Sequence, residues 1–236
     1  MQPLTILVVS DLHFEVGQFH GTDEYPALEW LLGIVERFKP SGLVGLGDWG
    51  TAWREEDWTK VTRLVQVHGI YGNHDNVPLL SQVKNRDGNP VLARDGEVRT
   101  LENLRFGFIN GIIAENTLRM KPVPRKTRQD FLRHIGRLKG VDVLCTHESP
   151  LVPSLERRIH PSIGTTTMGE VLKRVSPRIS FSGHVEEGYI VSKLGSILSV
   201  IIDSSQASKH FIVIKGSSEQ VSVHKDSETV ETVTFS

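Results

Sequence analysis

Five short apolar runs in this chain each end in residues that can bind metal ions, and this repetition constrains the fold more than any other feature. Such a run, rich in β-branched side chains, is typical of a strand buried on both faces. In a sheet of parallel strands, ligands gather at the carboxyl ends, so the five endings are expected to converge on one site. The endings are Asp11-Leu12-His13, Gly47-Asp48, Gly72-Asn73-His74-Asp75, Thr146-His147 and Gly183-His184.

The first third of the chain alternates strands with helices. Apolar runs at residues 5–10, 43–46 and 67–71 are separated by helical spacing of apolar side chains over residues 25–38 and 54–66. A strand-helix-strand-helix-strand order predicts a parallel sheet with right-handed crossovers.

The remainder of the chain is less regular. The stretch from residue 188 to 224 alternates apolar and polar residues, which predicts an antiparallel meander with turns at Gly195, Ser204-Ser205 and Gly216-Ser217. Before it we expect a hairpin of residues 98–101 and 104–109, helices near 129–138 and 166–175, and strands at 141–145 and 178–182.

Composition bounds the class of protein. With 236 residues and 38% hydrophobic residues, the chain can bury a sizeable core, and we expect residues 1–236 to form one domain. The net charge of -1 gives no overall positive field that would attract nucleic acid or an anionic membrane, but it does not exclude a local basic groove. A single cysteine, Cys145, excludes an intrachain disulfide, and it is expected to be a buried structural thiol. No apolar stretch approaches the roughly 20 residues that span a bilayer, so we expect no membrane contact and a cytoplasmic location.

The donors at the five endings suit a pair of divalent metal ions. Carboxylate, imidazole and amide oxygen together favour borderline metals such as Mn, Fe or Zn, and the imidazole content is too high for magnesium or calcium. The donors are too many for one tetrahedral ion, and a carboxylate in the middle of the sheet, as Asp48 would be, can bridge two. The alternatives are polar strand caps at Asp11 and His13, a turn built by Asn73 and Asp75, and histidines satisfied in the core.

Together the five blocks resemble the signature of the calcineurin-like metallophosphoesterase family, in the family's order and over most of the chain. The resemblance implies an α/β fold, a four-layer α-β-β-α sandwich of two mixed sheets flanked by helices. It implies that a first metal is held by Asp11, His13 and Asp48. It also implies that His74 is a catalytic acid steered by Asp75. A second metal is implied on Asp48, Asn73, His147 and His184.

One departure from the family pattern concerns the first metal. The family usually ends with Gly-His-x-His, whereas this chain has Gly183-His184-Val185-Glu186. We expect Glu186 to replace the missing imidazole as a ligand, because borderline metals accept oxygen at such a position. The alternatives are a weakened first site and a solvated acidic turn formed with Glu187. His20 and His160, which lie in loops, are expected to be surface residues.

The function that the resemblance implies is hydrolysis of phosphate mono- or diesters by a metal-bridging hydroxide at a dinuclear site, with His74 as general acid. The expected cofactors are two divalent metal ions, manganese first, with Fe, Zn or Ni as alternatives. The expected substrate is a phosphate-ester small molecule or nucleotide. A nuclease acting on DNA or RNA and a non-catalytic interaction module are the alternative functions, and the sequence does not indicate an oligomeric state.

Basic residues in two loops bear on the nuclease alternative. They could line a phosphate-binding rim, but we expect a solvated charged face instead. They are Arg119, Lys121, Arg125, Lys126 and Arg128 in one loop and Arg157-Arg158 in the other.

Overall fold

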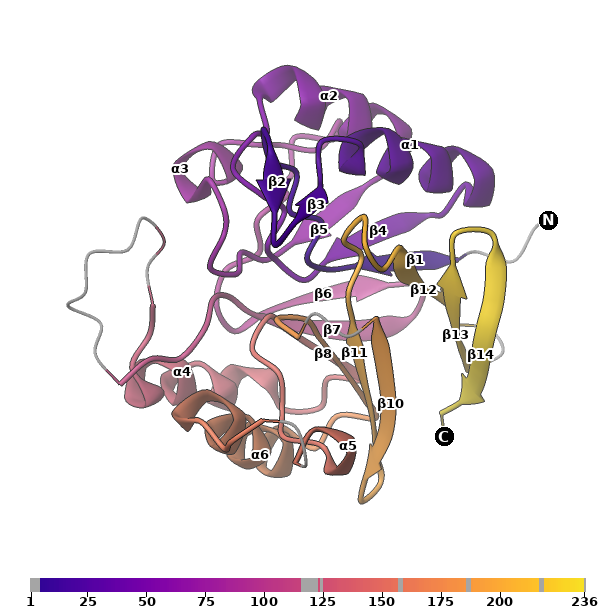
Figure 1. Ribbon diagram of the computed structural model, residues 1–236. Coiled ribbons are helices and arrows are strands. Elements are labelled where there is room, and N and C mark those ends of the chain that lie inside the picture. The colour runs from indigo at the N-terminus through magenta and orange to yellow at the C-terminus, as the bar shows by residue number, and fades with distance from the viewer. Residues whose placement is uncertain are drawn as a thin grey trace.

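Two mixed β-sheets pack face to face and carry helices on their outer surfaces, which confirms the expected α-β-β-α sandwich (Figure 1). The structure is a computed structural model that describes residues 5–115, 123, 125–156, 159–185, 188–216 and 219–235. No helix in the described residues has both the length and the apolar composition to cross a membrane.

The first sheet contains the parallel strands expected near the N-terminus. β1 (Ile6–Val9) pairs in parallel with β4 (Gly42–Gly45), which pairs in parallel with β5 (Val67–Gly69). On the other side of β1 the sheet continues with antiparallel strands β12 (His210–Lys215), β13 (Gln220–Lys225) and β14 (Glu228–Thr234).

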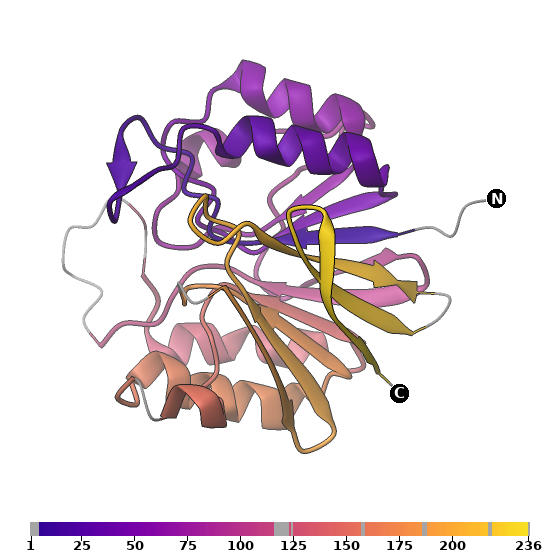
Figure 2. The same cartoon turned by 45° about the vertical axis from the view of Figure 1, so that its right-hand side comes forward.

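Helices α1 (Ala27–Phe38) and α2 (Glu55–Leu64) cover the outer face of the first sheet (Figure 2). Leu31 and Val61 are fully buried in the cluster that also contains Leu7 of β1. α1 ends at Phe38, and the next residue, Lys39, adopts a left-handed conformation with φ 44° just before Pro40. A short helix, α3 (Val77–Leu80), follows the His74 loop.

The second sheet has the strand order β10-β11-β9-β8-β7-β6, and its outer face is covered by other helices (Figure 2). The helices are α4 (Arg128–Arg133), the 3-10 helix η1 (Ile135–Leu138), α5 (Pro153–Glu156) and α6 (Ile163–Val175). The strands are β6 (Glu97–Leu101), β7 (Leu104–Ile109), β8 (Val143–Thr146), β9 (Ile179–Ser182), β10 (Tyr189–Leu194) and β11 (Ile197–Ile202).

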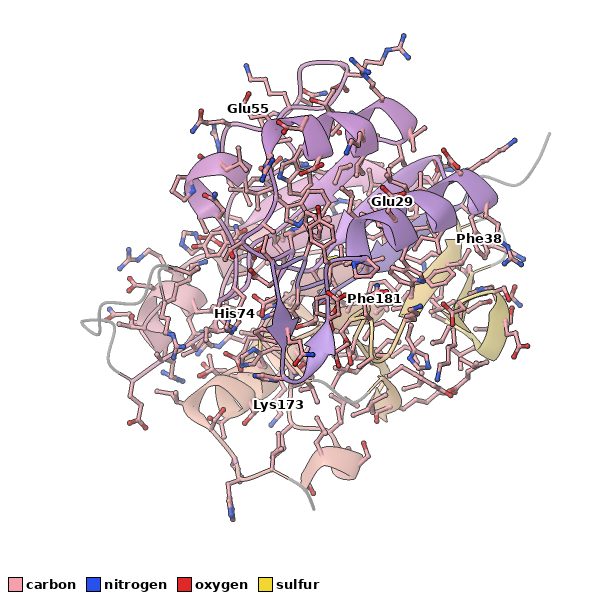
Figure 3. The ribbon with its side chains drawn as sticks, turned by 45° about the horizontal axis from the view of Figure 1, so that its top comes forward. Glu29, Phe38, Glu55, His74, Lys173 and Phe181 are labelled. Carbon is pink, nitrogen blue, oxygen red and sulfur yellow. The ribbon has the colours of Figure 1, made fainter. Side chains whose placement is uncertain are left out.

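The main core lies between the two sheets. Because side chains alternate along a strand, Ile6 and Val8 of β1 face the second sheet, whereas Leu7 and Val9 face the helices. Phe181 of β9 is buried in the intersheet cluster, while Glu29, Glu55 and Lys173 lie exposed on outer helices (Figure 3). Cys145 belongs to the same cluster, and burial raises the pKa of its thiol, as expected for a structural cysteine.

The predicted C-terminal meander is wrong as a single unit. β10 and β11 form an antiparallel hairpin in the second sheet, and β11 then pairs in parallel with β9. After residues 203–209 the chain crosses to the first sheet, where β12 pairs with β1. Local alternation predicts strands but does not specify their partners. The predicted helix at 129–138 is likewise two pieces, α4 and η1, separated at His134.

Candidate metal centre

The loops that follow five strands meet where the two sheets approach each other. Asp11 and His13 follow β1, and Asp48 follows β4. Asn73 and His74 follow β5 in the same sheet. His147 and His184 follow β8 and β9 of the second sheet. The convergence expected from the sequence is therefore present, and it joins donors from both sheets.

Asp48 belongs to two groups of candidate ligands. Asp11, His13 and Asp48 form one group, and Asp48, His147 and His184 form the other. Within each group, one donor atom per residue lies within 4.8 Å of the others. A shared carboxylate is what a bridge between two cations requires.

Individual distances fit ligands gathered around a common centre. His13 Nε2 lies 3.8 Å from Asp11 Oδ1 and 4.0 Å from Asp48 Oδ2. His147 Nε2 lies 3.3 Å from the same Asp48 oxygen. The other ring nitrogen of His147, Nδ1, lies 2.9 Å from the carbonyl oxygen of Leu46. When Nδ1 carries the proton and donates it to that carbonyl, Nε2 is free to coordinate a cation.

Asn73 has a side-chain oxygen, Oδ1, that is buried without a hydrogen-bond partner among the described residues. A buried unpaired oxygen is costly, and a cation would satisfy it. The backbone amides of Asn73 and His74 donate to Asp48 Oδ1 at 2.5 and 2.7 Å, which fixes this loop to the shared carboxylate.

Asp75 holds the loops of the centre through backbone amides. Its carboxylate is buried and accepts hydrogen bonds from the amides of Asp48 at 2.9 Å, Trp49 at 2.7 Å and Gly72 at 2.6 Å. The described structure contains no hydrogen bond from Asp75 to the His74 ring. Asp75 therefore positions the loops that carry Asp48 and His74 through their backbone, and its expected steering of His74 stays a prediction.

The His74 ring is exposed at the edge of the centre. It meets the ring of His13 edge-on at 5.5 Å between centroids. Its other aromatic neighbour is Phe19, at 5.2 Å, and the same phenyl ring stacks on His13 at 4.1 Å. Phe19 belongs to a small hairpin formed by β2 (Gln18–Phe19) and β3 (Thr22–Asp23), beside which His74 lies (Figure 3).

The backbone of the ligand loops is unusual. Asp11, His13, Asp48 and His184 have positive φ angles of 55°, 46°, 52° and 64°. Residues other than glycine seldom adopt positive φ angles, and such backbone conformations cluster at functional sites. Position 72 requires glycine because His147 and Asp48 approach its backbone closely. A Cβ there would lie 2.6 Å from His147 Nε2 and would also collide with Asp48.

The buried charges of the centre depend on one another. Burial raises the pKa of Asp11 to about 8, with the Asp48 carboxylate adding to the rise and His147 opposing it. Burial also disfavours ionised Asp48, but the charges of His147 and His13 hold the pKa of Asp48 below its usual range. Burial opposes protonation of His147, yet Asp48 and Asp11 raise its pKa to about 10. Buried carboxylates therefore need positive charge close by, which divalent cations would supply.

The donor set fits borderline divalent metals. Asp11, His13 and Asp48 could hold one ion, and Asp48, Asn73, His147 and His184 a second, with oxygen and imidazole nitrogen in each set. Glu186, the expected replacement ligand, lies outside the described residues, so its role stays a prediction.

The sequence does not predict the positions of two residues near the site. Phe19 lies in a polar loop between Gly17 and Gly21, and an aromatic residue in such a loop is the only local signal. Arg125 was expected on a solvated face, but it is half-buried and near His184. This position results from tertiary structure, and the spacing of residues in the sequence does not predict it.

Comparison with known proteins identifies the same fold. The family described as calcineurin-like phosphoesterase has a sequence model that matches residues 4–186. No curated protein matches the chain.

Several solved structures are similar at low sequence identity. The protein TT1561 of Thermus thermophilus has a TM-score of 0.68 at 13% identity, with 95% of this chain and 100% of that chain covered. A dimetal phosphatase from Danio rerio has a TM-score of 0.66 at 14% identity, with 99% of each chain covered. GAP50, the anchor in the inner membrane complex of Plasmodium, has a TM-score of 0.59 at 12% identity, with 98% of this chain and 88% of that chain covered.

Proposed function

Since the chain belongs to the calcineurin-like phosphoesterase family, we propose that it hydrolyses phosphate mono- or diesters at a centre of two divalent metal ions. The observation that supports this best is the position of Asp48, whose carboxylate is common to both ligand groups. A scaffold protein has no need of one buried carboxylate between two sets of imidazoles.

Each side chain has a role in this proposal. Asp11, His13 and Asp48 would hold the first ion, and Asp48, Asn73, His147 and His184 the second. Manganese is proposed because mixed oxygen and imidazole donors suit borderline metals. When bound, the two ions would lower the pKa of water and offset the negative charge of the phosphate.

His74 is proposed as the general acid that protonates the leaving oxygen. Its ring is exposed beside the candidate ligands, so a bound ester can reach it. The backbone on both sides of the ring is fixed, because the His74 amide donates to Asp48 and the His74 carbonyl accepts from Gly50 at 3.1 Å. Asp75 would support this acid by holding the loop.

The test is turnover of bis(p-nitrophenyl) phosphate and p-nitrophenyl phosphate by protein treated with EDTA and then supplied with manganese. We expect turnover with manganese and none with EDTA. The relative rates on the two substrates assign the mono- or diesterase preference. Absence of turnover with manganese, iron, zinc and nickel would contradict the proposal and favour a non-catalytic interaction module.

A nucleic-acid substrate is not proposed. Among the basic residues that could form a track, Lys126 pairs with Asp95 at 2.6 Å and Arg128 pairs with Glu170. Arg119, Lys121, Arg157 and Arg158 lie outside the described residues. A small phosphate ester or nucleotide is the proposed substrate.

We also propose that residues 1–236 act as one domain. The family match ends at residue 186, but β12 lies beyond it and pairs with β1 in the register Val8 to Ile212. The segment after the match therefore forms part of the sheet that carries Asp11 and His13.

A further inference from the structure

Two consecutive cations, Arg125 and Lys126, follow the Pro-rich stretch and serve different purposes. Lys126 has a structural role, because its Nζ donates hydrogen bonds of 2.6 Å to both Asp95 Oδ1 and the carbonyl oxygen of Asn110. Residue 126 bridges in parallel to Ile113, so the segment is extended there. Neighbouring side chains of an extended segment point to opposite sides, and Arg125 therefore points away from the Asp95 pair.

The segment that carries Arg125 lies beside the candidate metal centre. The amide of Ile113 donates to Glu148 Oε2 at 2.9 Å, and Glu148 directly follows the ligand His147. Desolvation lowers the pKa of His184, and the charges of His147 and Arg125 lower it further. Burial raises the pKa of Glu148, and the charge of Arg125 acts against that rise. Arg125 thus lies within electrostatic range of His184 and Glu148.

The guanidinium of Arg125 is only partly satisfied by the described part of the chain, where Glu148 interacts with its charge. Its Nε atom is buried and makes no hydrogen bond there, and no ion pair to a described carboxylate forms. A half-buried arginine with five donors in a planar fork is an unusual residue to leave without an ion pair. Arg128 and Arg133, which follow it closely, are exposed and pair with Glu170 and Asp130.

From this geometry we propose that Arg125 binds the phosphoryl oxygens of the substrate on the His184 side of the centre. This inference rests on the proposed function and adds a specific residue to it. Arginine matches phosphate in shape, since two N–H groups can donate in parallel to two oxygens. The buried Nε atom has no hydrogen bond among the described residues, and a phosphoryl oxygen of the substrate would supply one.

The test compares Arg125→Gln and Arg125→Lys with the control Arg133→Gln, which removes an equal charge from an exposed position. The binding of inorganic phosphate to manganese-loaded protein is measured by calorimetry, alongside metal content and thermal unfolding. We expect Arg125→Gln to weaken phosphate binding about 10- to 100-fold with unchanged metal content, because a charge-assisted hydrogen-bond pair is lost. Arg125→Lys should recover part of the affinity, and Arg133→Gln should bind as the parent protein does.

The ester assay separates the two proposals. Phosphate affinity unchanged in both Arg125→Gln and Arg125→Lys overturns the role of Arg125, while turnover by the parent protein leaves the proposed function standing. Loss of bound metal or of folding in Arg125→Gln with parent-like phosphate affinity in Arg125→Lys would make the residue structural and overturn its role as well. Weakened phosphate binding without turnover by the parent protein would support an anion site and contradict the hydrolase.

Discussion

Asp48 is the residue on which the two ligand groups depend. One of its oxygens accepts the amides of Asn73 and His74, and the other faces the imidazoles of His13 and His147. Its pKa is held below the usual range by His147 and His13, against the effect of burial. A single side chain thus connects loops from both sheets.

Asp48→Asn is expected to abolish binding of both metal ions, because the substitution removes the shared charge and keeps the shape. Asp11→Asn should remove the first ion alone, since Asp11 belongs to one group. Metal analysis after dialysis against manganese measures the number of ions per chain. Two ions retained by Asp48→Asn would contradict the bridging role, and a parallel loss of both in Asp11→Asn would argue for a single site.

His74→Ala is expected to slow hydrolysis of esters with poor leaving groups, such as alkyl or phenyl phosphates, by about 10²- to 10⁴-fold. Esters of p-nitrophenol, which leave without protonation, should be affected much less. His74 stands outside both ligand groups, so the variant should keep its metal. Equal losses on both kinds of leaving group, or loss of metal, would remove His74 from the role of general acid.

At the scale of elements, the β2–β3 hairpin is the part of the site that the sequence did not indicate. Phe19 stacks on His13 and meets the ring of His74 edge-on, so the hairpin restrains a candidate ligand and the proposed acid together. The far face of the same phenyl ring stacks on His20 at 4.2 Å. Because Phe19 separates His20 from His13, His20 is not placed to replace the missing family ligand.

Phe19→Ala is expected to reduce turnover of alkyl phosphates about 10- to 100-fold, because the His74 and His13 rings lose the surface that aligns them. Phe19→Tyr keeps the ring and should retain most of the activity. Val16→Ala, in the same loop but 80% exposed, is the matched control. Activity of Phe19→Ala close to that of Val16→Ala would show that the hairpin is not part of the site.

The contrast between β1 and β12 explains which elements the sequence could predict. Residues 5–10, a continuous apolar run between turn signals, are identified by composition alone, and the five strand ends place Asp11, Asp48 and His147 correctly at one site. The pairing of β12 with β1 joins residues about 200 positions apart, and periodicity carries no information on such partners. For the same reason Phe19 and Arg125 acquire their positions only in the folded chain.

At the scale of the whole molecule, the candidate metal centre contains two buried carboxyl groups, Asp11 and Asp75, that resist ionisation. Burial raises the pKa of Asp11 from 3.8 to about 8 and that of Asp75 from 3.8 to about 7. The folded protein therefore holds protons that the unfolded chain releases above pH 4. Without metal, these two carboxyls should lower the free energy of unfolding as pH rises from about 4 to about 8, by up to about 1.4 kcal/mol per pH unit for each. Burial lowers the pKa of His68 and of His184 to about 4, which opposes this fall below pH 6.5, so the net fall is expected between pH 6.5 and 8.

Urea unfolding of EDTA-treated protein at pH 5, 6, 7 and 8 measures this dependence. Asp11→Asn should flatten it, because the group that resists ionisation is removed. A stability that rises between pH 6.5 and 8 would mean that the carboxyls are ionised in the folded protein without a cation.

Metal ions bound at the same centre should stabilise the packing of one sheet against the other. Asp11, His13 and Asp48 follow strands of the first sheet, whereas His147 and His184 follow strands of the second. A ligand that binds only the folded state raises the free energy of unfolding by about 2.7 kcal/mol when its free concentration is 100 times its dissociation constant. Because the donors come from both sheets, we expect manganese to slow hydrogen exchange in β1 and β4 and equally in β8 and β9. Asp48→Asn should show no such change. Slower exchange confined to one sheet would mean that the ions are held by that sheet alone and that the shared carboxylate does not join the two halves.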